Sequence, residues 1–251
     1  MKNCINIKSN QNAKLYKLQG EKMKKFYITC LIFMSTLIAA EVDSTTDQCE
    51  ATNDISTEKV FTKDFSGTFN GQKLNYTASL KEKILYEKDN PKAELASFYY
   101  SEYIVSSDEN RPIMFIFNGG PGSASLWLHM GVLGPKIVKV PSDASDDGSP
   151  PYNIIDNNLS PLSETDMVFI DPIGTGYSRA LGCHDGEEFW GVNEDPKIIA
   201  EFIRRWITDN KRWNSPRYIL GESYGGIRGP LLVSELRSGD ITAIEINGLL
   251  M

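Results

Sequence analysis

The sequence is poor in the residues that bind metals and transfer protons: 251 residues include two His and four Cys. No two Cys have the C-x-x-C spacing of a zinc or redox site, so neither a metal nor another cofactor is expected. Basic residues are also scarce, with 26 Lys and Arg against 33 Asp and Glu. Because phosphate backbones bind to basic surfaces, this balance excludes nucleic acid as an expected partner.

Long apolar runs are absent except near the amino terminus. Residues 26–38 are almost wholly apolar, with Met23 and two lysines before them and two alanines after them. This order predicts a secretory signal peptide in residues 1–40. The run is shorter than the roughly 20 residues that span a bilayer, so we expect no stable membrane insertion after cleavage. We therefore expect export to the periplasm or the extracellular space, and an uncleaved anchor is the alternative.

The start of the chain carries a second hypothesis. The residues before Met23 hold five Lys and no clear pattern. A chain that started at Met23 would have a more regular signal peptide, so Met1 is interpreted as a mis-assigned start. Amino-terminal sequencing of the mature protein tests this, and any peptide from residues 1–22 would contradict it. Without residues 1–40 the chain is strongly acidic, with 19 basic and 32 acidic residues.

The cysteines allow a disulfide but do not define one. Cys4 and Cys30 lie in the predicted signal peptide, which leaves Cys49 and Cys183. Export to an oxidising compartment permits these two to pair. Pairing of either one with a residue beyond Met251 is the alternative.

The remaining sequence predicts one α/β domain. Residues 41–62 are polar and lack periodicity, which indicates a flexible lead-in. Residues 63–251 are expected to form the amino-terminal part of the domain. Alternating apolar residues over 65–105, punctuated by turn residues, predict antiparallel strands joined by hairpins. Short apolar runs predict further strands at 113–117, 167–170, 218–220 and 241–250.

Two helices are expected between these strands. Apolar residues recur at helical spacing from Ile198 to Ile207, so one face of this helix is predicted to be buried. Asp195 is expected to cap the helix and Pro196 to lie in its first turn. A second helix is predicted around residues 231–236. Alternating strands and helices imply a mostly parallel sheet, with the hairpins as its antiparallel edge.

The motif that indicates chemistry is Gly221-Glu222-Ser223-Tyr224-Gly225. It is a G-x-S-x-G sequence between a predicted strand and a predicted helix. A sharp turn there presents the serine hydroxyl above the sheet, and glycines on either side let the backbone pass closely. The amide after the serine then points at a developing oxyanion. A plain glycine turn with a surface serine is the alternative.

A second glycine loop supports this interpretation. Residues 118–122, Asn-Gly-Gly-Pro-Gly, follow a predicted strand. In an α/β-hydrolase, the other donor to the oxyanion comes from a loop at this place. A tight structural turn is the alternative.

Three motifs together resemble the serine carboxypeptidases. These are NGGPG at 118–122, DPIGTGYS at 171–178 and GESYGG at 221–226, in the order and spacing of that family. The resemblance covers roughly Phe65 to Met251, which is similar to the first half of a family member, and its wording is closest to the bacterial branch. It implies an α/β-hydrolase fold that is cut short after the nucleophile turn.

The resemblance also implies roles for single residues. Ser223 matches the acylated nucleophile, and Gly120 and Tyr224 match the positions whose backbone amides form the oxyanion hole. The terminal carboxylate of a peptide substrate is held in the family at the positions of Asn118, Gly119 and Glu222. A carboxyl group binds a carboxylate by sharing a proton, so the resemblance implies a preference for acidic pH.

The sequence departs from the family pattern near this site. Val132 stands where better-known members have a second Glu, and Ser123 stands where they have Cys. Ile227 and Arg228 replace the usual His and Tyr, and Arg228 is a candidate for holding a substrate carboxylate. Because the carboxyl pair is incomplete, an esterase or acyltransferase is the alternative to a carboxypeptidase.

The catalytic base is not found after the nucleophile. In α/β-hydrolases an acid and then a His follow the serine along the chain, but no His follows Ser223 here. His129 and His184 precede it and are interpreted as structural or exposed. The acid and the His are therefore expected beyond Met251.

The leading interpretation is an exported serine carboxypeptidase whose sequence is incomplete and whose substrate is a peptide with a free carboxy terminus. The alternatives are an esterase or acyltransferase on the same fold and a catalytically inactive fragment. Side-chain preference and oligomeric state are not predicted by the sequence.

Overall fold

The computed structural model describes residues 56–105, 110–140, 143, 150–238 and 243–251. The predicted signal peptide lies outside the described residues, and so does Cys49. Cys183 takes part in a disulfide, and its pairing with Cys49 stays a prediction. No helix within the described ranges is long and apolar enough to cross a membrane.

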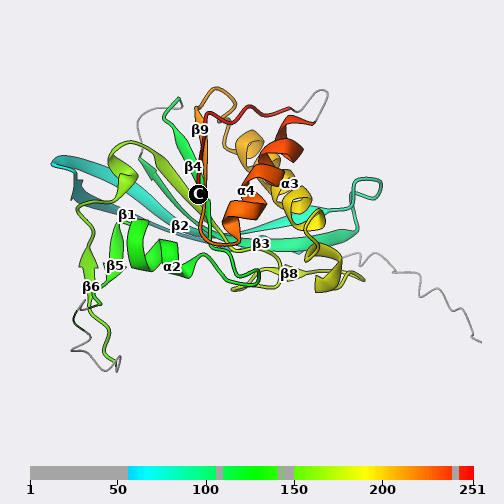
Figure 1. Cartoon of the computed structure of the whole chain (residues 1–251), viewed down its shortest axis with the longest axis horizontal. Helices are drawn as coiled ribbons and strands as arrows, with labels where there is room; N and C mark the ends of the chain where they lie inside the picture. Colours follow the sequence, from blue (N-terminus) through cyan, green and yellow to red (C-terminus); the bar gives the residue numbers. More distant parts are fainter. Residues whose placement is uncertain (1–55, 106–109, 141–142, 144–149, 239–242) are drawn as a thin grey trace, which may run out of the picture. The chain divides into compact units, whose positions relative to one another are not determined.

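A mixed sheet forms the centre of the described domain (Figure 1). Its order is β1-β2-β3-β7-β4-β9-β10, with β8 paired to β3. These strands are β1 (Val60–Phe69), β2 (Gln72–Tyr86), β3 (Glu94–Val105), β4 (Ile113–Phe117), β7 (Asp166–Ile170), β8 (Arg179–Ala180), β9 (Arg217–Gly221) and β10 (Gly248–Leu250). A separate antiparallel pair consists of β5 (Lys136–Val138) and β6 (Ile154–Asp156).

The antiparallel strands lie where the turn residues predict them. β1 and β2 pair up to Phe69 and Gln72, so Asn70 and Gly71 form the turn, and both have positive φ (48° and 82°). Asn and Gly are the residues that adopt this backbone most readily. β2 pairs with β3 in the next hairpin. The predicted hairpins are confirmed, and β1 begins at Val60, inside the expected lead-in.

The parallel strands are β7, β4, β9 and β10. All five residues of β7 are buried, as continuous apolar runs in a covered parallel sheet require. The strand predicted over 241–250 is shorter in the structure, where β10 starts at Gly248. The backbone N–H of Ile244 donates to Leu236 of the preceding helix, and that of Asn247 donates to Arg217. The segment before β10 is thus bonded to α4 at Ile244 and reaches β9 only at Asn247.

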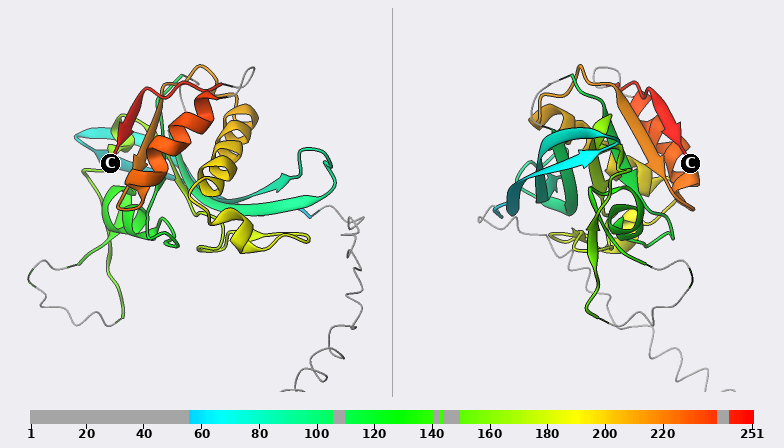
Figure 2. Two further views of the ribbon diagram at one scale, coloured as in Figure 1. Left: turned by 45° about the vertical axis from the view of Figure 1, so that its right-hand side comes forward. Right: turned by 90° about the vertical axis from the view of Figure 1, so that its left-hand side faces the viewer.

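Helical elements cover both faces of the parallel part. α3 (Glu194–Asp209) and α4 (Gly225–Arg237) pack against each other on one face (Figure 2). The short α2 (Leu126–Leu128) and the π-helical η1 (His129–Leu133) belong to the core of the other face. The 3-10 turns η2 (Pro161–Ser163) and η3 (Gly186–Phe189) lie in the connections.

Alternation along the central strands separates the two cores. Phe115 and Phe117 of β4 join the core under α3 and α4, while Ile116 between them joins the opposite core. The apolar face predicted for α3 is confirmed, since Phe202, Ile203 and other residues at helical spacing are fully buried. The cap assigned to Asp195 is wrong. Asn193 holds the N-cap position without a side-chain cap bond, and the Asp195 carboxylate is buried in an ion pair.

Candidate active site

Ser223 lies at a strained turn between β9 and α4. Its φ is +59°, in the left-handed region that non-glycine residues rarely adopt, and the residue is exposed. A Cβ at Gly221 would lie 2.5 Å from the carbonyl oxygen of Gly225, so glycine is required for the turn to close. Non-glycine strain of this kind is concentrated at functional sites. The strand–turn–helix context predicted for the motif is therefore confirmed.

The glycine loop after β4 lies directly against this turn. β4 and β9 are parallel neighbours, with Phe117 opposite Gly221, so their loops leave the same edge of the sheet. A Cβ at Gly119 would lie 2.4 Å from the backbone N of Tyr224 and 2.6 Å from the carbonyl oxygen of Glu222. Loop and turn can approach this closely because no side chain stands between them.

Three backbone donors at the positions implied by the resemblance are available to a ligand. Among the described residues, the N–H groups of Gly119, Gly120 and Tyr224 have no hydrogen-bond acceptor. Gly119 is itself buried. Because buried N–H groups are normally paired, the unpaired N–H of Gly119 beside an exposed serine indicates a site that can bind an anion or an oxyanion.

The side chains of Asn118 and Glu222 meet across the two loops. Asn118 is buried, and its Nδ2 donates to Oε2 of Glu222 at 3.2 Å. Its Oδ1 accepts from the N–H of Leu128 at 3.1 Å, which anchors it to α2. Glu222 is exposed. The structure thus brings the three residues Asn118, Gly119 and Glu222 together.

Arg228 is buried beneath the same loop. Its Nε donates to Oδ2 of Asp195 at 2.6 Å, and its Nη1 donates to the carbonyl oxygen of Asn118 at 2.7 Å. Its guanidinium also lies over the rings of Phe117 and Tyr224. Burial raises the pKa of the Asp195 carboxyl, and the charge of Arg228 opposes that shift. Sequence reasoning missed this pair, because no spacing links a residue of α3 to one of α4.

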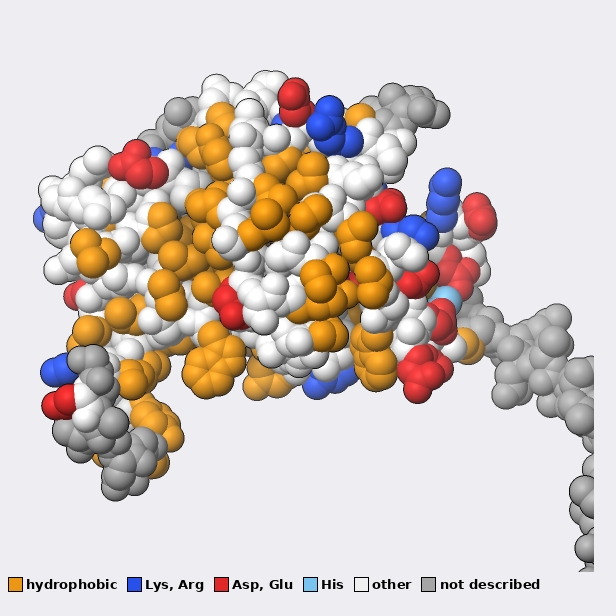
Figure 3. All heavy atoms as spheres, in the orientation of Figure 1, with side chains coloured by type: hydrophobic (Ala, Val, Ile, Leu, Met, Phe, Trp, Pro, Cys, Tyr) orange, Lys and Arg blue, Asp and Glu red, His pale blue; other side chains and the backbone are white. Residues whose placement is uncertain are grey.

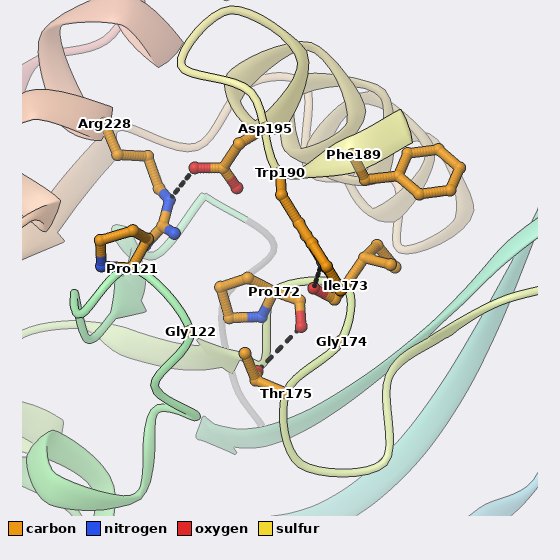
Figure 4. A pocket seen from close by; sticks show the side chains of 10 residues that line it. All are labelled: Pro121, Gly122, Pro172, Ile173, Gly174, Thr175, Phe189, Trp190, Asp195 and Arg228. Carbon is orange, nitrogen blue, oxygen red and sulfur yellow. Dashed lines mark hydrogen bonds and ion pairs between the residues drawn. The ribbon is translucent and has the colours of Figure 1, made fainter. Parts of the chain in front are cut away.

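A cavity of about 290 Å³ opens beside the glycine loop (Figure 4). The polar groups in its walls are largely satisfied: Trp190 Nε1 donates to the carbonyl of Ile173, and Thr175 Oγ1 donates to that of Pro172. It is lined by Pro121, Gly122, Pro172, Ile173, Gly174, Thr175, Phe189, Trp190, Asp195 and Arg228.

Hydrophobic side chains also gather on the surface near these elements. Figure 3 shows them across the middle of one face, with charged side chains mainly toward its edges. Exposed apolar residues close to the site in sequence include Leu126, Trp127 and Ile227, and the exposed Trp190 lines the cavity. Extended exposed apolar area of this kind is typical of a binding surface.

The motif at 171–178 has a structural part in the site. Oδ1 of Asp171 accepts from the N–H of Ser125 at 2.8 Å, which ties the end of β7 to the start of α2. Gly176 has a φ of +53°, in the left-handed region that L side chains rarely adopt, and a Cβ there would also overlap the Asp171 carboxyl, so glycine is favoured at this turn. Burial raises the pKa of Asp171, and the bond from Ser125 opposes the shift.

Both histidines make their hydrogen bonds away from Ser223. His129 Nε2 lies 2.6 Å from the hydroxyl of Tyr103, and burial lowers its pKa to about 4. His184 hydrogen-bonds to Glu188 and Glu87, and its pKa is raised, chiefly by the bond to Glu188. Neither His contacts Ser223, which agrees with their structural interpretation. No group of three or more metal-ligating side chains occurs in the described part of the chain.

Comparison with known proteins decides the family. The family model described as "Serine carboxypeptidase" matches residues 73–251. This chain belongs to the serine carboxypeptidase family. With the strand order and the strand–turn–helix geometry at Ser223, this membership makes the domain an α/β-hydrolase fold.

The curated relatives of this family member are longer than the chain. Serine carboxypeptidase-like 5 of Arabidopsis thaliana is 28% identical over 151 residues, which are 59% of this chain and 33% of that protein. Serine carboxypeptidase-like 9 of the same plant is 29% identical over 152 residues, with the same shares. The chain therefore spans about a third of the length of the relatives it matches.

Solved structures similar to the chain are more distant. A structure described as a predicted CIB-like hydrolase from Thermoplasma acidophilum is 17% identical, with a TM-score of 0.35, and the match covers 68% of this chain and 61% of that one. An epoxide hydrolase of Aspergillus niger is 13% identical, with a TM-score of 0.36, and covers 68% and 34%.

Proposed function

We propose that this chain carries the nucleophile of an exported serine carboxypeptidase that releases carboxy-terminal residues through an acyl-enzyme. The observation that carries the proposal is the exposed Ser223, held at φ +59° beside three unpaired backbone N–H groups. Family membership supports hydrolase chemistry at this serine. The apolar run in residues 26–38 supports the export part of the proposal.

The reaction follows from these groups. Ser223 Oγ attacks the carbonyl carbon of the last peptide bond, and the N–H groups of Gly120 and Tyr224 stabilise the negative oxygen that forms. The C–N bond then breaks, and the terminal amino acid leaves with a proton. Water hydrolyses the acyl-enzyme ester and restores the hydroxyl. The proton transfers need a general base at Ser223 and an acid that orients this base.

The substrate class follows from the second part of the site. Asn118, Gly119 and Glu222 lie together next to Ser223 and present an unpaired buried N–H and a carboxyl group. In the proposal they hold the free carboxylate of a peptide, which places the last peptide bond at the nucleophile.

An esterase or acyltransferase is the second candidate. Val132 of η1, which replaces the second Glu of better-known members, is 58% exposed and offers no hydrogen bond to a carboxylate. The same acyl-enzyme can pass its acyl group to an alcohol or to water. A substrate that lacks a free carboxylate would therefore also suit the site.

The test uses protein from the complete reading frame. We expect the wild type to react with a fluorophosphonate and to cleave a peptide with a free carboxylate much faster than its amide. Ser223→Ala should lower kcat by about 10⁶-fold and abolish labelling. Ser123→Ala, directly after the glycine loop, is the matched serine control, and its kcat should stay within about threefold of the wild type.

The outcomes separate the candidates. Efficient cleavage of an ester with no cleavage of the free-carboxylate peptide would favour the esterase. If Ser223 stays unlabelled in the folded wild type, the chain belongs to an inactive member of the family.

A further inference from the structure

Arg228 hydrogen-bonds to the carbonyl oxygen of Asn118, which belongs to the same peptide group as the N–H of Gly119. The carbonyl of Asn118 and the N–H of Gly119 belong to one planar peptide unit. This peptide bond is trans, since the cis bonds of the described residues are Gly120–Pro121 and Pro150–Pro151. In a trans peptide these two groups point in opposite directions. Whatever fixes the carbonyl therefore also fixes the direction of the N–H.

Arg228 is well placed to fix that plane. Its side chain is 2% exposed, and its Nη1 holds the Asn118 oxygen at 2.7 Å. Asp195 of α3 holds Nε at 2.6 Å, and the rings of Phe117 and Tyr224 flank the guanidinium. Figure 4 shows the Arg228–Asp195 pair beside Pro121 of the same glycine loop. A planar guanidinium with two donors in use on two different groups has little freedom to turn.

The other end of the plane is free. Gly119 is buried, and its N–H has no acceptor among the described residues. Because Arg228 holds the Asn118 carbonyl of the same peptide plane, the Gly119 N–H keeps its direction without an acceptor of its own. Such preorganised donors bind an anion without first having to reorient.

We propose that Arg228 is a positioning residue for carboxylate recognition: with Asp195 as its anchor, it orients the Asn118–Gly119 peptide so that the Gly119 N–H points at the substrate's terminal carboxylate. This inference rests on the proposed function. It differs from direct binding, because both assigned donor groups of Arg228 are already engaged within the protein.

The experiment measures preference for a free carboxylate. For protein from the complete reading frame, kcat/KM is determined for a peptide and for its carboxy-terminal amide, and the fluorophosphonate labelling rate of Ser223 is followed separately. Arg228→Gln should lower the peptide-to-amide ratio by about 10- to 100-fold, the range of a hydrogen bond to a charged group, and mainly through KM. Labelling should change less than threefold.

Two further variants make the result specific. Arg228→Lys keeps the charge but cannot bond to both groups, so it should recover part of the ratio. Arg204→Gln is the matched control: Nη2 of Arg204 also joins α3 to α4, through the carbonyl of Glu235 at 2.6 Å in the last turn of α4. It should leave the ratio unchanged. If Arg228→Gln does not fold, Arg228→Lys decides. A peptide-to-amide ratio below that of the wild type then supports the inference, and the wild-type ratio overturns it.

The possible failures are distinguishable. A wild type that labels at Ser223 but shows no preference for the free carboxylate would overturn the proposed function, and this inference with it. A wild-type preference that persists in folded Arg228→Gln or Arg228→Lys would overturn this inference alone. The same holds if labelling and ratio fall together, because Arg228 would then support the whole turn.

Discussion

At the scale of single residues, glycines let two loops share one small site. Gly119 lies so close to the turn at Ser223 that any β-carbon would overlap backbone atoms of Tyr224 and Glu222. Backbone atoms at both ends of the contact cannot move aside as a flexible side chain can. The left-handed Ser223, which costs about 1–3 kcal/mol in backbone strain, persists because its surroundings are fixed in this way.

Gly119→Ala should therefore disrupt the site. We expect kcat/KM to fall by about 100-fold or more, because shifts near 1 Å at a reacting centre have effects of this size. Gly226→Ala is the control: its Cβ would meet nothing within 4 Å, and Gly226 lies in helix α4. This change should keep activity and stabilise the protein by about 0.5–1 kcal/mol. Kinetics and thermal unfolding of both variants check the pair, and full activity of Gly119→Ala would contradict the contact.

At the scale of elements, one histidine docks a helical segment onto the sheet. His129 opens η1, stacks on Phe169 of β7 and hydrogen-bonds to Tyr103 of β3. Asn118 fixes the neighbouring α2 through Leu128. Asn118 therefore contacts both this helical segment and Glu222, one of the residues proposed to bind the substrate carboxylate.

Burial of His129 makes this docking dependent on pH. Its folded pKa of about 4 lies below the unfolded value of 6.5, so the unfolded chain takes up a proton first as the pH falls. The free energy of unfolding is therefore unaffected by protonation of His129 above pH 6.5, and it falls by roughly 3 kcal/mol between pH 6.5 and pH 4. Denaturant unfolding at pH 7 and pH 4 should show this loss, and His129→Gln should reduce it.

His184 provides a control of opposite sign. Its pKa is raised by Glu188 and Glu87, so its contribution is present at acidic pH and is lost as the pH rises through the folded pKa. The difference in the free energy of unfolding between the wild type and His184→Gln should therefore grow as the pH falls.

Identical pH profiles of stability for the wild type and His129→Gln would contradict the docking role of His129.

At the scale of the whole domain, stability and chemistry lie at opposite edges of the parallel sheet. The site occupies the carboxyl ends of β4 and β9. At the amino ends, the fully buried Asp166 accepts from Arg111 at 3.2 Å, from Arg212 at 2.8 Å and from the N–H of Val105 at 2.9 Å. Four separate segments are joined at this one carboxylate.

Asp166→Ala should therefore destabilise the domain without altering the site. Removal of one partner leaves two guanidinium groups uncompensated, and we expect a loss of about 3–5 kcal/mol in the free energy of unfolding. Asp156→Ala removes an exposed ion pair with Lys136 and should change it by less than about 1 kcal/mol. Denaturant titration measures both. Where the Asp166 variant is still folded, an unchanged labelling rate at Ser223 is expected, and a loss of labelling would contradict the separation.

Local patterns in the sequence predicted the short elements and the sharp turn at Ser223. Turn residues at 70–71 set the first hairpin, helical spacing set the buried face of α3, and the glycines around Ser223 set the sharp turn, because each of these depends on backbone freedom or on periodicity within a short segment. Tertiary structure decided the rest. The contacts of Arg228 with Asp195 and Asn118, the burial of His129 and the short β10 depend on which distant segments meet, and no local pattern encodes the energy of such a meeting.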